Sequence, residues 1–387
     1  MSAITSSFVG STAGLKTVQA QKSAARTSVV TRAGAFDDEL LKTVGIITTP
    51  GKGILAMDES NGTCGMRLES VGVENTEENR RSYRELLLTT PGLNQFIGGA
   101  ILFEETLYQS ASDGRTFVQV MNDANIVPGI KVDKGLVPMV NAAEGETWCQ
   151  GLDFLAQRCA EYYKQGARFA KWRSSISVAA TATGPSMIAQ RDCAYGLARY
   201  AAICQSEGLV PIVEPEVLLD GEHDIDSTLA VWQDIWAETF KYLADNSVFF
   251  EGILLKPSMV TPGADCPKRE DPATVAAYTL KALRRRVPPA VPGIMFLSGG
   301  QSELEATLNL NAMNQAPNPW HVSFSYARAL QNTTLKTWAG AADNVEAAQA
   351  ALIQRAGNNS AAQLGKYVPD GEAATAAEGM YEKGYKY

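Results

Sequence analysis

The chain has 387 residues, of which 45% are hydrophobic, and this is enough to bury the core of one large globular unit. It carries 34 Lys and Arg against 42 Asp and Glu, so its formal net charge is −8. So acidic a chain disfavours nucleic acid as a partner. No apolar run approaches the roughly 18 residues of a membrane-spanning helix, and we expect no membrane partner.

The first segment of the chain differs from the rest in charge. Residues 1–36 contain no acid and are rich in Ser, Thr and Ala. Their basic residues are Lys16, Lys22, Arg26 and Arg32. A basic, hydroxyl-rich segment without a long apolar centre is typical of an organellar transit peptide. We therefore predict a disordered transit peptide over residues 1–35, cleaved near residues 31–36. A disordered tail without a targeting role is the alternative.

Short apolar runs bounded by Gly or Pro recur along the rest of the chain, and such runs are typical of buried strands. The eight runs begin at Gly53, Gly98, Pro128, Ala167, Leu209, Phe250, Gly293 and His321. Most of them lack the strict alternation of apolar and polar residues that marks a half-exposed sheet. This pattern favours parallel strands that are covered on both faces.

Most of the segments next to these runs show helical spacing of their apolar residues. The predicted helices span residues 37–47, 76–89, 152–165, 188–205, 227–244, 272–285 and 302–314. Between the second and third runs the helical pattern is weakest, and we expect a loop with a short helix there. Eight strand–helix repeats predict an α/β fold, a (β/α)8 TIM barrel, as a single domain over residues 36–356.

Polar residues follow the predicted strands at their carboxyl ends, where the catalytic groups of such barrels lie. In chain order they are Asp58, Glu59, Glu104, Glu105, Lys131, Asp133, Lys171, Arg173, Glu214, Glu216, Lys256, Ser298, Gly299, Gly300, Ser325 and Arg328. A barrel without chemistry would not need charge at nearly every strand end. The sequence therefore predicts a polar ring above an apolar core.

Metal chemistry is restricted by the histidine count. The chain has only His223 and His321, and a zinc site of the aldolase type needs several converging imidazoles. A magnesium site made only of carboxylates, from Asp58, Glu214 and Glu216, is the remaining metal alternative. We expect no metal and no cofactor.

The stretch "EGILLKPSMVTPG" (251–263) places Lys256 directly after an apolar strand. An unprotonated lysine amine can condense with a ketone to an iminium, which withdraws electrons from the adjacent carbon–carbon bond. A lysine with the ordinary pKa of about 10.4 is protonated at neutral pH, but burial and a second cation such as Lys171 would lower that pKa. A buried lysine paired with a carboxylate explains Lys256 equally well, and the pattern alone leaves both readings open.

Iminium formation needs a proton shuttle near the amine. Glu214 ends the strand before Lys256 and is placed for this role; an ion pair with Lys171 or Lys256 is the alternative. Asp58 ends the first strand and could take a hydroxyl proton as a carbon–carbon bond breaks. Its alternative role is to cap the helix that follows.

Two stretches indicate anion binding. "SGGQS" (298–302) places two glycines between a strand and a helix, so that backbone N–H groups can face a phosphate. It ends the seventh strand, and Arg328 follows the eighth, which is the usual place of a barrel phosphate site. "DESNGT" (58–63) with Lys131 offers hydroxyls, amides and a cation for a second anion. Two such sites flanking a lysine indicate a bisphosphorylated sugar.

These residues together resemble a known family. The stretches are "GILAMDES", "GIKVDKG", "FAKWR", "VPIVEPE", "LLKPSMVTPG", "FLSGGQSE" and "FSYARALQ". They are similar to the signature stretches of class I fructose-1,6-bisphosphate aldolase, and the resemblance covers residues 37–387 in unbroken order. The serine-rich leader and the ending "KGYKY" resemble the plastid form, which implies the chloroplast stroma as location.

The resemblance implies a role for each matched position. Lys256 matches the Schiff-base lysine, Glu214 the acid/base of the carbinolamine steps, and Asp58 the residue that manages the carbon 4 hydroxyl. Lys171 matches the lysine that orients the substrate, and Glu216 a supporting carboxylate. Tyr387 matches a C-terminal tyrosine associated with proton exchange at carbon 3, so residues 357–387 are expected to form a flexible C-terminal arm over the active site.

The resemblance also implies the substrate-binding residues. Ser298, Gly299, Gly300, Ala327 and Arg328 match the cradle of the carbon 1 phosphate, with Arg67 nearby. Ser60, Thr63 and Lys131 match the side of the carbon 6 phosphate, and Arg173 and Ser325 complete the set. Arg80 matches a further arginine, for which a structural role fits better. Ala327 stands where glycine is common, and Thr63 where serine is.

The implied reaction is reversible cleavage of fructose 1,6-bisphosphate to dihydroxyacetone phosphate and glyceraldehyde 3-phosphate, in glycolysis, gluconeogenesis and the Calvin cycle. The expected partners are phosphorylated sugars and further copies of the chain in a homotetramer. Two rivals remain. A phosphosugar isomerase would use Glu214 as its base and would leave Lys256 in an ion pair. A non-catalytic scaffold should have lost at least one of Lys256, Glu214 and Asp58, and all three are present.

Overall fold

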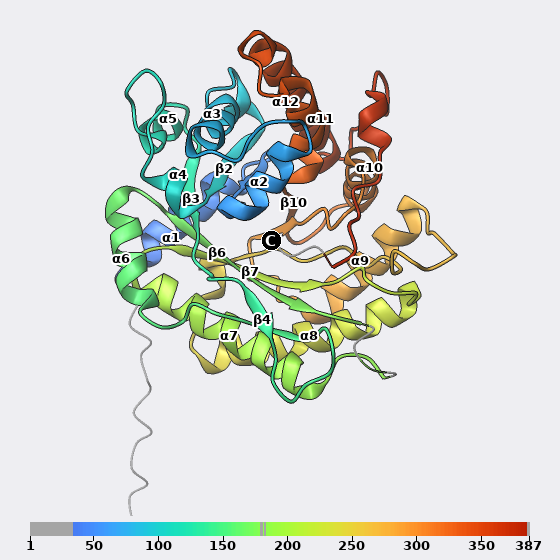
Figure 1. The fold of residues 1–387 in the computed structure, drawn as a ribbon. Helices are drawn as coiled ribbons and strands as arrows, with labels where there is room; N and C mark the ends of the chain where they lie inside the picture. Colours follow the sequence, from blue (N-terminus) through green and yellow to red (C-terminus); the bar gives the residue numbers. More distant parts are fainter. Residues whose placement is uncertain (1–33, 179–180, 182, 385–387) are drawn as a thin grey trace, which may run out of the picture. The chain divides into compact units, whose positions relative to one another are not determined.

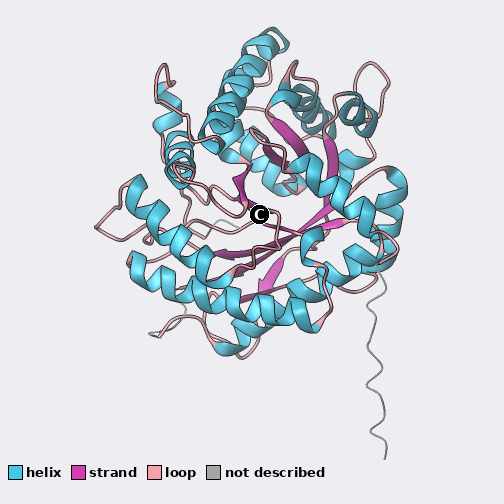
Figure 2. Ribbon diagram, turned by 180° about the vertical axis from the view of Figure 1, so that it is seen from behind, coloured by secondary structure: helices cyan, strands magenta, loops and turns pink. Residues whose placement is uncertain are grey.

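A computed structural model describes residues 34–178, 181 and 183–384 (Figures 1 and 2). The predicted transit peptide, apart from its last residues, and Tyr387 lie outside the described residues. Within the described part no helix is both long and apolar enough to cross a bilayer.

Eight parallel strands close into a barrel in the order β1-β10-β9-β8-β7-β6-β3-β2. They are β1 (Gly53–Met57), β2 (Ile97–Leu102), β3 (Val127–Lys131), β6 (Phe169–Ile176), β7 (Val210–Val217), β8 (Leu254–Leu255), β9 (Gly293–Phe296) and β10 (His321–Tyr326). Figure 2 shows the magenta strands enclosed by cyan helices. The predicted (β/α)8 barrel is confirmed.

Every predicted helix is present to within a few residues. They are α1 (Asp37–Ile47), α3 (Glu77–Leu88), α6 (Leu155–Gln165), α7 (Met187–Ser206), α8 (Ile225–Asp245), α9 (Pro272–Arg286) and α10 (Glu303–Met313). Side-chain caps fix several of their starts. The hydroxyl of Thr76, for example, accepts the backbone N–H of Asn79 at 3.1 Å ahead of two glutamates in the first turn of α3.

Several elements differ from the sequence prediction or add to it. The strand expected from Phe250 is reduced to β8, because Phe250–Gly252 forms a 3-10 turn and only Leu254 and Leu255 pair with both neighbours. The weakly helical segment contains α4 (Glu104–Leu107) and α5 (Phe117–Asp123). The helix considered after Asp58 is α2 (Asn61–Glu69), whereas α11 (Arg328–Trp338) and the antiparallel pair β4 (Leu136–Pro138) and β5 (Thr147–Cys149) were not predicted.

Helix α12 (Val345–Gln363) also had no counterpart in the prediction. It packs on α10 and α11 and continues through residue 357, where the sequence placed the start of the C-terminal arm. The segment without an α-helix therefore begins at Leu364.

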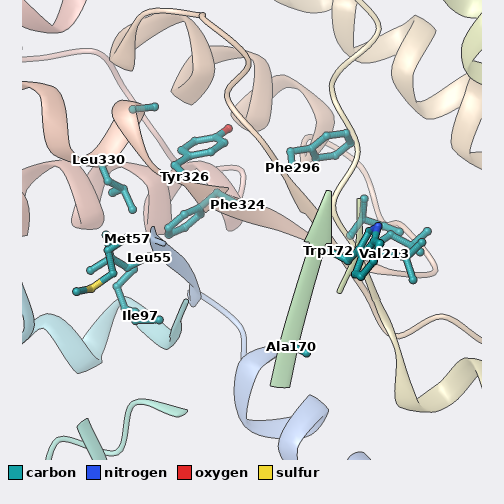
Figure 3. Close-up of a cluster of buried hydrophobic side chains, with 14 of the residues drawn as sticks. Leu55, Met57, Ile97, Ala170, Trp172, Val213, Phe296, Phe324, Tyr326 and Leu330 are labelled. Atoms are coloured by element: carbon teal, nitrogen blue, oxygen red, sulfur yellow. The ribbon is translucent and has the colours of Figure 1, made fainter. Parts of the chain in front are cut away.

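The barrel strands separate two apolar clusters because their side chains alternate between the two faces. Ile54 and Ala56 of β1 point into the barrel, whereas Leu55 and Met57 pack outward against the helices. Figure 3 shows part of the outer cluster, with Leu55 and Met57 grouped beside Ile97. Helix α1 closes the amino end of the barrel, and three of its apolar residues join the inner cluster: Leu40, Val44 and Ile47.

The inner cluster is packed closely enough to restrict backbone positions. A Cβ at Gly129 of β3 would lie 2.2 Å from the ring of Phe169, which is fully buried.

We predict that Gly129→Ala lowers the free energy of unfolding by about 1–3 kcal/mol, because the ring has no room to move. The matched control is Gly196→Ala in α7, where a Cβ meets nothing within 4 Å. It should raise that free energy by about 0.5–1 kcal/mol. Denaturant titration measures both, and a Gly129→Ala chain as stable as the wild type would contradict the packing argument.

Candidate active site

The alternation that fills the barrel with apolar groups also directs the polar residues that follow. Phe169, Ile212 and Leu254 belong to the inner cluster. Two positions further along each chain segment, a titratable side chain therefore points to the same side. These side chains are Lys171, Glu214 and Lys256, and Asp58 follows Ala56 in the same way. The four groups meet at the carboxyl ends of β1, β6, β7 and β8, which are far apart in the sequence for β1 and consecutive for the other three. They lie above the apolar layer that fills the barrel.

The centre of the site is a chain of alternating charges. The Lys171 ammonium lies 3.1 Å from Asp58 Oδ2 and 3.4 Å from Glu214 Oε2. The Lys256 ammonium lies 3.3 Å from the other oxygen, Glu214 Oε1. None of the four residues is more than 7% exposed. The two lysines and two carboxylates thus compensate one another away from bulk water.

Burial and charge act differently on the two carboxyl groups. Burial raises the pKa of Asp58, but the charges of Lys171, Lys256 and Lys131 outweigh it and lower the pKa to about 2. Burial also acts on Glu214, and there it outweighs the opposite effect of Lys171 and Lys256. The pKa of Glu214 is therefore raised. Burial lowers the pKa of Lys171, but Asp58 and Glu214 outweigh it and raise that pKa. One carboxyl group is therefore a fixed anion, and the other is suited to take up and release a proton.

The side predicted to hold the carbon 1 phosphate combines a glycine turn with an arginine. Gly299 and Gly300 have φ values of +48° and +80°, which other residues rarely adopt. Arg328 opens α11 and donates to the carbonyl of Met380. Ala327 has φ −101°, so this position does not use the left-handed conformation that would require glycine. Helix α10 is capped by Ser302, and its first turn carries Glu303 and Glu305.

The residues predicted for the carbon 6 phosphate are mostly engaged with protein groups. Ser60 caps α2 by accepting the N–H of Thr63 at 3.3 Å, and the two hydroxyls lie 3.0 Å apart. The cap is therefore Ser60 rather than Asp58. Lys131 lies 2.7 Å from the carboxylate of Asp133. Arg80 donates to Glu105 at 2.7 and 2.8 Å and to Asn75 at 2.7 Å, which agrees with a structural role.

The remaining predicted residues lie between these two sides. Arg173 is ion-paired with Glu216, and both are buried. The Ser325 hydroxyl, 1% exposed as a residue, has no hydrogen-bond partner among the described residues. Glu104 and Glu105 were expected in the polar ring, but they open α4 and pair with Lys134 and Arg80 outside the site.

Two adjoining cavities open at this end of the barrel. The first is lined by Ala56, Asp58, Lys171, Glu214, Glu216, Lys256, Leu297, Ser298, Ser325 and Ala327. The second is lined by Arg173, Glu216, Leu218, Leu219, Asp220, Gly299, Gly300, Arg328, Tyr381 and Glu382. Lys256 therefore faces a cavity, and Glu216 borders both. A wider hollow of about 610 Å³ lies beside α1 at the amino end of the barrel and contains none of the predicted site residues.

The end of the described chain reaches the second cavity, and the dark red segment in Figure 1 runs toward the middle of the barrel. The N–H of Met380 donates to Gly300 at 3.1 Å, and Arg328 donates to the Met380 carbonyl. On the opposite rim, the Tyr381 hydroxyl and the Gly384 N–H both donate to Asp220, at 3.1 and 2.8 Å. Sequence reasoning missed Asp220, Tyr381 and Leu297, because nothing in their local pattern distinguishes them.

No group of three or more His, Cys, Asp or Glu side chains within the described ranges is arranged to hold a metal ion. Asp58, Glu214 and Glu216 are the three carboxylates considered for magnesium. Each is ion-paired with a basic side chain: Asp58 with Lys171, Glu214 with Lys256, and Glu216 with Arg173.

Comparison with known proteins identifies the family. The family model described as fructose-bisphosphate aldolase class-I matches residues 39–387. The chain belongs to the class I fructose-bisphosphate aldolases. Fructose-bisphosphate aldolase 1, chloroplastic, of Chlamydomonas reinhardtii is 72% identical to this class I aldolase over 377 residues, covering 97% of the chain and 98% of the relative. The chloroplastic enzyme of Oryza sativa subsp. japonica is 68% identical over 360 residues, 93% of this chain and 92% of its own.

A solved structure agrees with these relatives. Fructose-bisphosphate aldolase from Plasmodium falciparum, in a complex with TRAP and a small-molecule inhibitor, superposes with a TM-score of 0.84 at 51% identity. The match covers 86% of this class I aldolase and 96% of that chain. The predicted family and the prediction of a lyase are confirmed. The prediction of a chloroplast form is confirmed by the relatives.

Proposed function

We propose that the alternating charges at the barrel mouth carry out reversible cleavage of fructose 1,6-bisphosphate to dihydroxyacetone phosphate and glyceraldehyde 3-phosphate. The observation that carries this assignment of residues is the position of Lys256. Its amine is buried, faces a cavity and lies 3.3 Å from a carboxyl group whose pKa is raised.

The first step joins the amine to the substrate. The Lys256 nitrogen gives up a proton to Glu214 Oε1, which lies 3.3 Å away, and attacks carbon 2 of the open-chain ketose, and Glu214 passes that proton to the former carbonyl oxygen. The resulting carbinolamine carries a hydroxyl group. The nitrogen gives a second proton to Glu214, which passes it to this hydroxyl, so that water leaves and the iminium, a protonated carbon–nitrogen double bond, forms. A raised pKa suits this exchange, because the carboxyl group must act as both acid and base.

The second step breaks the bond between carbons 3 and 4. Asp58, kept ionised by the surrounding lysines, takes the proton from the carbon 4 hydroxyl. The electrons of the broken bond move to the iminium, which becomes an enamine, and glyceraldehyde 3-phosphate leaves as the aldehyde. Lys171 stays cationic between the two carboxyl groups and holds Asp58 at 3.1 Å. Protonation at carbon 3 and addition of water then release dihydroxyacetone phosphate.

The two phosphate groups are assigned to the two sets of residues that were predicted from the sequence. We assign the carbon 1 phosphate to Ser298, Gly299, Gly300, Ala327 and Arg328, with Arg67 beside them. We assign the carbon 6 phosphate to Ser60, Thr63 and Lys131. Arg173, Glu216 and Ser325 would contact the sugar between them, and the unpartnered Ser325 hydroxyl in the cavity wall supports this placement. Arg80 is held by Glu105 and Asn75 and contributes to the shape of that region.

We assign protonation at carbon 3 to Tyr387, and the arm that carries it is the segment after α12. The support is the course of residues 380–384 along the second cavity, three residues short of the tyrosine.

Deleting Tyr387 should lower kcat for the bisphosphate by about 10–100-fold, the range of a lost general acid, without changing the thermal unfolding temperature. A truncated chain that turns over as fast as the full one would remove the arm from the mechanism.

Two properties of the whole protein also belong to this proposal. We infer that residues 1–35 are removed as a transit peptide, and N-terminal sequencing of the chloroplast protein tests the boundary. We infer a homotetramer from the family. A particle mass equal to that of one chain, which is at most the 41.5 kDa of all 387 residues, would contradict it.

Reductive trapping tests the proposed chemistry. Borohydride added with dihydroxyacetone phosphate should attach the three-carbon unit to Lys256 alone, because reduction converts the imine to a stable amine. Lys256→Arg should abolish the adduct and lower cleavage at least about a thousandfold. The matched control is Lys171→Arg, which keeps the nucleophile and should still form the adduct. A peptide map without modification at Lys256 would contradict the mechanism and favour an isomerase in which Glu214 is the base.

A further inference from the structure

A buried arginine behind the site contacts the end of β1. Arg84 of α3 is 1% exposed and is among the largest fully buried side chains. Its Nε donates to the carbonyl of Met57 at 3.1 Å, and its Nη2 donates to the carbonyl of Glu59 at 3.0 Å. These two carbonyls flank Asp58 in the chain, so one rigid guanidinium contacts the backbone on both sides of that residue.

The backbone at this point lies just beyond the regular strand. Strand β1 ends at Met57, and its last register partner is Leu102 of β2. Helix α2 begins only at Asn61, so residues 58–60 belong to no helix or strand. The two hydrogen bonds from Arg84 therefore replace the strand ladder where Asp58 has to be held. Arg84 borders neither cavity of the site in the described structure, so any effect on the reaction passes through other residues.

The same guanidinium is connected to the predicted phosphate side. The Glu59 carboxylate accepts from Arg84 Nη2 at 3.1 Å and is ion-paired with Arg67, and its side chain is only 3% exposed. Arg84 also directs Nη1 at the Cys64 sulfur, at 3.2 Å. Because Glu59 pairs with the buried Arg84 and with the partly exposed Arg67, the network links Arg67 to the frame of Asp58.

We propose that Arg84 is a positioning residue for carbon–carbon bond cleavage, which holds the Met57 and Glu59 carbonyls so that the Asp58 carboxylate stays aligned with the substrate hydroxyl. This inference rests on the role proposed for Asp58. Imine formation with dihydroxyacetone phosphate needs Lys256 and Glu214 but not a proton acceptor for a carbon 4 hydroxyl. Loss of the clamp therefore affects cleavage and leaves imine formation intact.

The test is Arg84→Lys in the full chain, because lysine keeps the charge but cannot donate to two carbonyls with one planar group. We expect kcat for fructose 1,6-bisphosphate to fall about 10–100-fold, as for a misplaced reacting group. Borohydride trapping of dihydroxyacetone phosphate on Lys256 should be unchanged. Arg84→Lys should add little further loss in an Asp58→Asn background, because both changes act on the same group.

The matched control is Arg81→Lys on the same helix. Arg81 pairs with Glu78 and Glu85 near the surface, and its replacement should leave kcat within about twofold. If Arg84→Lys does not fold, Glu59→Gln weakens the same network and should lower kcat while trapping persists. An unchanged kcat, or equal losses of cleavage and trapping, would overturn the positioning role. A wild-type chain that is not trapped at Lys256 would instead overturn the proposed function.

Discussion

The contact on which the site depends is the one that Lys171 makes with two carboxyl groups at once. Its ammonium lies 3.1 Å from Asp58 and 3.4 Å from Glu214, and all three groups are buried. A buried cation must be compensated, and a buried carboxylate must be paired. The shared cation meets both needs and acts to lower the pKa of both carboxyl groups, but burial outweighs the neighbouring lysines in Glu214 and not in Asp58. Two chemically similar groups can therefore serve as a fixed base and as a proton carrier.

This arrangement is a consequence of barrel geometry as much as of charge. Phe169 and Lys171 point to the same side of β6, as do Ile212 and Glu214 on β7. The apolar members fill the barrel and are closed off by α1, so that the polar members stand on a rigid floor. Behind them, Arg84 anchors the end of β1 from the outside. The polar groups of the proposed site are thus fixed from below and from behind, and the cavity that we assign to the sugar lies beside them.

The sequence predicted the fold and the central residues because both follow from local patterns. Apolar runs that each end on a polar residue define the strands and, by alternation, the groups that meet at the mouth. The pairing inside the site could not be predicted in the same way, because the contact between Lys171 and Asp58 joins residues 113 positions apart. The short β8 and the role of Asp220 likewise depend on neighbours from distant segments. The pattern of "LLKP" left the role of Lys256 open, and the structure adds that this lysine contacts Glu214 and also faces a cavity.

The central claim is that burial and the surrounding charges separate the proton affinities of Asp58 and Glu214. Infrared difference spectra of the enzyme without substrate, recorded during an acid titration, measure this directly, with Asp58→Asn and Glu214→Gln variants to assign the carboxyl bands. The band of Asp58 should keep its ionised form until the pH approaches about 2, whereas Glu214 should take up its proton above the usual range of a glutamate. If both groups take up protons over the same range as exposed carboxylates, the division of labour between them is contradicted.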